Sequence, residues 1–395
     1  MADLIFTYDL APINANRFSS PLGAITADFK KFDQSLEASN SRVLAFGASA
    51  GLILGIQRAF SALVKTTIDV EKNLADINVI FQLNNKQFTE FGAKLFEIGK
   101  NTGQAFKEIT ESAKELSRQG LSATETLNRV NAALILTRQS GLPAADSVKT
   151  ITAALNSFQK EALDAVSVVN KLANVDAKFA VSSRDLAEAI SRTGSSAELA
   201  GVKFDELIGL VTAAQATTSR GGAVISQALN SVFARLGRTG TIEELKELGV
   251  QINASQSGIE KLKALASAIK GASREQAALI ADSAGGIRNL NVLSAVLTDL
   301  GNKYSLVARA TNESRNATDE AITRNEELNK TYAALTNRTL LNIQQVGAQF
   351  GKLTLGPGLE KVLGSINTIL EGAISKDSGS AGQFLGQGIL KGLGE

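Results

Sequence analysis

Apolar residues recur at helical spacing in several separate stretches of the chain. In the first stretch, from Leu22 to Leu36, the apolar side chains are three or four residues apart. The same spacing returns between Phe88 and Ile98, and again between Phe106 and Leu116. Residues three and four positions apart lie on one face of a helix, so each stretch predicts an amphipathic helix with one buried face.

The joints between these stretches share a pattern of glycine, an aliphatic residue, three further residues and an acid. It begins at three positions: Gly120, Gly141 and Gly201. A glycine past a helix end can close the last turn in the left-handed conformation, and the acid then falls where the next helix dipole favours negative charge. Two pairs also have capping-box spacing: Ser122 with Glu125, and Thr241 with Glu244. Short joints fold neighbouring helices back on one another, which predicts an all-α helical array over residues 43–300.

The ends of the chain have a different pattern. Residues 1–42 are expected to form an N-terminal arm and an amphipathic helix, with Leu4–Leu10 as a short strand or extended segment. No Gly or Pro occurs in residues 302–346, and apolar residues are sparse there, so residues 301–350 are predicted to contain one long polar helix. Its thin apolar stripe would be buried in a coiled coil with sister chains. The glycine-rich residues 351–395 are expected to continue into a longer chain.

One apolar segment, Val43–Ile56, has two interpretations. Its fourteen residues are interrupted only by Ser49. The segment is too short to span a bilayer, which favours a buried core helix. Membrane contact at Val43–Ile56 is the alternative.

The composition removes most candidate chemistry. The chain has no Cys, His or Trp, so disulfides, thiolate and imidazole metal sites and His-dependent catalysis are excluded. Residues 347–353 have a partial phosphate-loop pattern, but Leu353 stands where Ser or Thr should hold magnesium. Glycine pairs at 221–222 and 285–286 are interpreted as joints, and carboxylate pairs at 243–244 and 326–327 as solvated helix faces. The chain is therefore expected not to be an enzyme, and no catalytic, cofactor-binding or metal-binding residue is assigned.

The charge pattern adds one further exclusion. Basic and acidic residues nearly balance at a net charge of +2, and the basic residues do not cluster. Aromatic residues, mostly Phe on apolar faces, are not interleaved with them. The electrostatic footprint of a nucleic-acid-binding protein is missing, so no specific nucleic-acid binding is expected.

Three stretches, taken in order, resemble the core region of the phage tail tape measure family. They are residues 68–77, residues 192–207 and residues 227–236. Each alone is a common Ala-, Gly- and Leu-rich pattern, but their order and separation resemble the family across residues 43–250. The resemblance implies a structural protein of the virion, assembled in the host cytoplasm inside the lumen of a growing tail. It also implies several copies, three or six, in contact with the tail tube protein, tail tip or hub proteins and tail assembly chaperones.

Tape measure proteins are usually much longer, so the chain is either a fragment, which we favour, or belongs to a short tail. Two other functions stay open beside the tape measure role. One is a membrane-perturbing protein that assists DNA delivery, and the other is a helical adaptor unrelated to phages.

Overall fold

The structure of the chain is a computed structural model that describes residues 69–70 and 72–331, together with positions 334, 337, 338, 341, 342, 344 and 345. Contacts divide the chain into two compact units, of which Asn73–Leu341 is the larger. The described residues contain helices, turns and loops but no strand, which confirms the all-α class. The predictions for residues 1–42, Val43–Ile56 and residues 351–395 lie outside the described residues.

The described part of the unit consists mainly of helices of 9 to 18 residues joined by short loops. Residues 72–81 are helical and precede the first labelled helix. The array then contains α3 (Asn85–Thr102), α4 (Phe106–Ser117), α5 (Ala123–Ser140), α6 (Ala144–Ser157), the 3-10 turn η2 (Gln159–Glu161), α7 (Ala165–Lys178), α8 (Ser183–Leu199), α9 (Phe204–Thr218) and α10 (Gly222–Leu236). It ends with α11 (Thr239–Glu247), α12 (Gly258–Lys270), α13 (Arg274–Gly285), η3 (Ile287–Asn289) and α14 (Leu290–Leu300).

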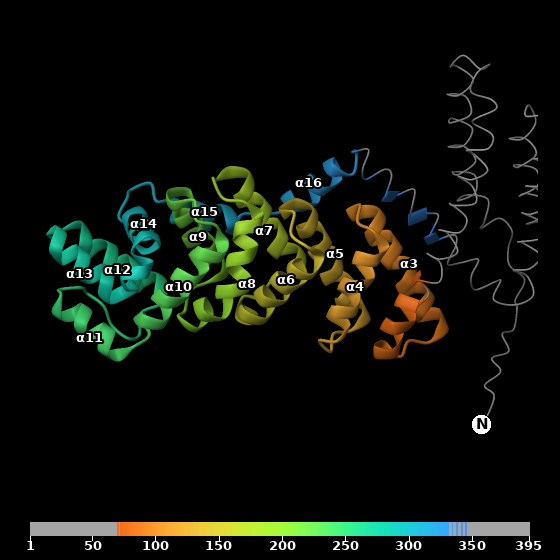
Figure 1. Ribbon diagram of the computed structural model, residues 1–395, viewed down its shortest axis with the longest axis horizontal. Helices are drawn as coiled ribbons and strands as arrows, with labels where there is room; N and C mark the ends of the chain where they lie inside the picture. Colours follow the sequence, from red (N-terminus) through yellow and green to blue (C-terminus); the bar gives the residue numbers. More distant parts are fainter. Residues whose placement is uncertain are drawn as a thin grey trace, which may run out of the picture. The chain divides into compact units, whose positions relative to one another are not determined.

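Helices α3 to α10 follow one another in two layers (Figure 1). One layer stacks α4, α6, α8 and α10, and each begins 38 or 39 residues after the previous one. The other layer contains α3, α5, α7 and α9. Hydrogen bonds repeat at the same interval, as between Lys160 and Glu198 or between Asn230 and the Arg192 carbonyl, which are both 38 residues apart. A fixed interval of this size is typical of stacked helical repeats, a feature that the sequence analysis did not find.

The predicted joints are largely confirmed. Gly120, Gly141 and Gly201 all take the left-handed conformation, with φ of 77°, 67° and 70°. The acid of each joint is the third residue of the next helix. Ser122 caps α5 by accepting the Glu125 N–H at 3.2 Å. The Thr241 capping box is wrong, because α11 already begins at Thr239 and Thr241 lies inside it.

Residues 306–328, which we call the strap, return along the array (Figure 1). The strap consists of α15 (Leu306–Arg315) and α16 (Glu320–Leu328). Helix α15 packs against α9, α7 and α14, and α16 crosses α7 and α5 to reach α3. The prediction of one long helix is therefore wrong for this part of residues 302–346, since the chain is non-helical before Leu306 and breaks between Arg315 and Glu320.

The break in the strap has a tertiary cause. The side chain of Asn170, on α7, donates to the Thr318 carbonyl at 2.6 Å and accepts the Ala321 N–H at 3.0 Å. These two bonds satisfy backbone groups that a continuous helix would pair internally. Asn170 lies 148 residues before Thr318, so no local pattern indicates the break.

Candidate functional site

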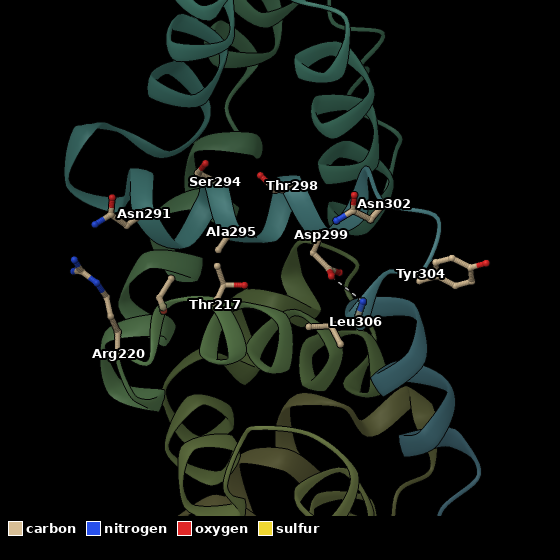
Figure 2. A pocket seen from close by; sticks show the side chains of 11 residues that line it. Thr217, Arg220, Asn291, Ser294, Ala295, Thr298, Asp299, Asn302, Tyr304 and Leu306 are labelled. Carbon is tan, nitrogen blue, oxygen red and sulfur yellow. Dashed lines mark hydrogen bonds between the residues drawn. The ribbon is translucent and has the colours of Figure 1, made fainter.

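A polar groove of about 690 Å³ lies where α9, α14 and the start of α15 meet (Figure 2). Asn291, Ser294 and Thr298 line it from one face of α14, because they are three and seven positions apart along that helix. Arg220 lies at one end of the groove and the exposed ring of Tyr304 at the other. The groove thus offers hydroxyl and amide groups with a single guanidinium.

The one carboxylate of the groove, Asp299, already has partners. Its oxygens accept the Ser305 hydroxyl at 2.7 Å, the Leu306 N–H at 2.8 Å and the Val307 N–H at 2.9 Å. The side chain is buried and accepts from the amides at the start of α15 that have no partner within the helix, a position where a negative charge also suits the helix dipole. Asp299 therefore fixes where the strap begins, and the groove lining contains no acid–base pair.

The two glycine pairs lie at close helix contacts. The Gly221 N–H donates to the Gln215 side chain at 2.8 Å and the Gly222 N–H to Asp185 at 3.1 Å, so both amides are engaged. A Cβ at Gly222 would overlap the Asp185 carbonyl oxygen. At Gly286 a Cβ would lie 2.9 Å from the Arg235 guanidinium. Close packing explains both pairs without a bound phosphate.

The carboxylate pairs 243–244 and 326–327 are exposed on α11 and α16. Glu244 accepts a hydrogen bond from Ser283 at 2.7 Å, and Glu327 pairs with Lys330 at 2.6 Å. Within residues 72–331 and the few described positions beyond them, no group of three acidic side chains is placed to hold a metal ion. The phosphate-loop pattern at 347–353 lies outside the described residues.

A second polar site joins the strap to the array at Asp205, on α9. Lys171 Nζ lies 2.9 Å from Asp205 Oδ1 and donates to the Ser314 carbonyl at 3.0 Å, and the Ser314 hydroxyl donates to the same carboxylate. The side chains of Lys171 and Asp205 are only 13% and 14% exposed. The charges are paired and hydrogen-bonded, as buried charges must be.

Three cations gather near the end of the array by α3. Arg338 donates to the Lys100 carbonyl at 3.3 Å, and Arg138 donates to the side chains of Asn325 and Asn329 at 3.1 and 2.6 Å. Burial lowers the pKa of Arg138, and the positive charge of Arg338 lowers it further. Burial also lowers the pKa of Lys100, where Glu97 opposes the effect and Arg338 adds to it. Like charges thus face one another across this contact.

Two of the three family-like stretches pack directly together. Residues 192–202 lie on α8 and its C-terminal joint, and residues 227–236 lie on α10. Thr193 donates to the Ser226 carbonyl at 3.3 Å, next to the bond between Asn230 and Arg192. The apolar residues around them are all buried: Ile190, Leu207, Leu210, Val211, Leu229 and Phe233. The segment is therefore part of the core, while part of the stretch 68–77 lies outside the described residues.

Comparison with known proteins identifies the array. None of the helices among the described residues combines the length and apolar character needed to cross a bilayer. No solved structure gives a significant match to the chain. The family model of phage-related minor tail proteins matches residues 85–286, about half of the chain, from the first residue of α3 to the residue that follows α13. The chain belongs to the phage-related minor tail protein family and is a structural protein of the phage tail.

Proposed function

We propose that this tail protein acts as a tape measure, a non-enzymatic scaffold whose copies occupy the tube lumen and set the tail length. The family match over the helical array carries the proposal, because it coincides with the stacked repeats and ends before the strap. Because such repeats contact mainly their neighbours, a chain of this kind can be lengthened or shortened by whole repeats. The ordered family-like stretches on α8 and α10 support the same role.

The partners follow from this role. Three or six copies would associate with one another and contact the tail tube protein, the tip or hub proteins and the assembly chaperones. The groove by α14 and the exposed faces of the array offer hydrogen-bonding groups for such contacts, and nothing in the groove lining is arranged for a reaction.

Removing one repeat tests the proposal. Deleting residues 144–182 removes α6, η2 and α7 and joins α5 to α8 at the natural interval. Duplicating the same residues adds one repeat. If the chain sets tail length in an extended helical state, tails should shorten or lengthen by about 60 Å, at about 1.5 Å per residue.

Electron microscopy of phage particles carrying each change measures the result. If the protein with the deletion fails to fold, no tails form. In that case, the tail length measured with the duplication decides the outcome. Tails of unchanged length from both variants would exclude the tape measure role and leave a minor structural role in the tail.

A further inference from the structure

The strap is held on the array mainly by polar groups. Its buried apolar residues are few and mostly small: Val307, Ala310 and Ala321. Its other buried residues are polar: Thr311, Ser314 and Asn325. Small and polar side chains remove little apolar surface from water, so the hydrophobic contribution to strap binding is small.

Most hydrogen bonds across this contact run from array side chains to the strap backbone. Besides Asn170 and Lys171, Asn174 donates to the Glu313 carbonyl at 2.7 Å, and Gln139 donates to the Ala321 carbonyl at 2.6 Å. The ion pairs Lys178–Glu313 and Arg324–Asp176 lie at the edge. When the strap leaves, water can replace these partners, so the net loss is much smaller than the number of bonds implies.

The contact also contains polar groups that it does not satisfy. Among the described residues, Gln139 Oε1, Asn174 Oδ1 and Thr311 Oγ1 are buried without a hydrogen-bond partner. Such atoms retain the cost of lost hydration. Release of the strap relieves this cost.

We propose that the strap is an exchangeable element that closes on its own array in a free chain and on the array of a second copy when chains lie side by side. The second copy carries an identical strap, so every bond described above can form between two chains as well as within one. The connector of residues 301–304 is non-helical and exposed at Asn302, Lys303 and Tyr304, which makes it the hinge. The bonds of Asp299 to the start of α15 break when the strap leaves and form again with the Asp299 of the second copy. The strap itself exposes few apolar side chains during exchange, because Val307, Ala310 and Ala321 are the buried apolar residues that it carries.

Cross-linking between two labelled copies tests the exchange, and its outcome does not depend on tail length. The chain has no Cys, so single cysteines can be introduced cleanly. Full-length chains carrying K178C are mixed with chains carrying E313C, because Lys178 Nζ and Glu313 Oε2 are 2.5 Å apart in the closed strap. A short bismaleimide then joins the two cysteines where the strap of the E313C chain lies on the array of the K178C chain. A double variant, K178C/E313C, gives the intrachain product as a positive control.

The matched control is K107C mixed with E313C, because Lys107 lies on α4 and its side chain is 79% exposed. We expect a heterodimer from K178C with E313C that increases with protein concentration, and none from the control. A mixture that yields no heterodimer, while the double variant cross-links within one chain, would overturn the proposal. Equal heterodimer yields from test and control mixtures would overturn it too, because they would show random collision.

Gly209, on α9, gives an independent perturbation. A Cβ there would lie 2.6 Å from the Val307 carbonyl oxygen and would overlap the Thr311 hydroxyl, so G209A should displace α15 while favouring helix α9 itself. Introduced only into the E313C member, it should raise the heterodimer yield severalfold, because that strap then clashes with its own array but not with the array of the K178C member. The control is G240A, where a Cβ meets no atom within 4 Å. A yield unchanged by G209A, with helix content retained by circular dichroism, would show that the strap does not leave its place.

Discussion

The contact between Phe158 and Phe204 should hold together the middle of the array. Phe158 follows α6 and Phe204 begins α9, and their ring centroids are 5.3 Å apart with planes at 75°. Both side chains are almost fully buried, at 1% and 0% exposure. Replacing either ring by alanine removes its burial and leaves a cavity, which costs about 3–5 kcal/mol of unfolding free energy. The edge-to-face geometry adds a coupling of about 0.5–1.5 kcal/mol beyond burial.

A double-mutant cycle measures this coupling. Urea denaturation of the full chain, of F158A, of F204A and of the double variant gives four unfolding free energies. We expect the double variant to lose less stability than the sum of the single variants, by about 1 kcal/mol. As a control, F158A is combined with F91A, since Phe91 packs against Phe81 on the helix at 72–81, and these two losses should add. A Phe158–Phe204 coupling below about 0.3 kcal/mol would refute the packing argument.

Three further changes have expected outcomes that the same denaturation experiments measure. F233A should cost about 3–5 kcal/mol because Phe233 is only 3% exposed on α10, and an unchanged midpoint would refute its place in the core. G222A should cost about 1–3 kcal/mol, since its Cβ would meet the Asp185 backbone, whereas a loss below that of G240A would contradict the close contact. Burial raises the pKa of Glu161 above its ordinary 4.5, although the Phe204 N–H bond opposes this, so stability should fall as pH rises from 4.5 through the raised value. E161Q should flatten that slope, and an identical pH profile in the variant would refute the assignment.

At the strap contact, the pKa of Glu313 is shifted in the opposite direction from that of Glu161. The hydrogen bond and charge of Lys178 lower the pKa of Glu313 below its ordinary 4.5. A carboxyl whose pKa is lowered in the folded state stabilises it above the ordinary value and loses that effect as pH falls through the lowered one. The E313C variant lacks this carboxyl, so the measurement is hydrogen exchange of residues 306–328 and not cross-linking. Protection of the strap should fall at acidic pH in the unmodified chain and should fall less in E313Q. Equal losses of protection in both proteins would contradict this role of Glu313.

The part of the fold that follows apolar periodicity was predictable. Phe106, Ile109, Ala113 and Leu116 follow one another at intervals of three, four and three residues, and all are buried on α4, because a regular stripe has one face to bury. The glycine joints were predictable for a similar reason, since the left-handed conformation favours glycine locally. In both cases the physical cause lies within a few residues of its effect.

The strap was not predictable in this way. Its buried positions, such as Ala310, Ser314 and Asn325, are small or polar, and their burial depends on partners far away in the chain. Ile322, which the apolar pattern would bury, is 38% exposed. The interval of 38 or 39 residues was not predicted, because it is a regular spacing between the first residues of α4, α6, α8 and α10 and not a repeat of the same residue types. The groove by α14 was missed because hydroxyl and amide residues on one helix face also occur on ordinary solvated helices.

The return of the strap affects how the unit would respond to a pulling force. Asp76 pairs with Lys114 on α4, and Leu341 lies against Gly99 on α3, so the two ends of the unit emerge at the same end of the array. Tension between these ends acts on the contacts of α16 first and on those of α15 afterwards, so the contacts break one after another. Peeling of weak polar contacts needs less force than shearing a packed core, because each contact opens separately. A stretched chain would therefore release α16 first and then α15, while the helices of the array stay packed.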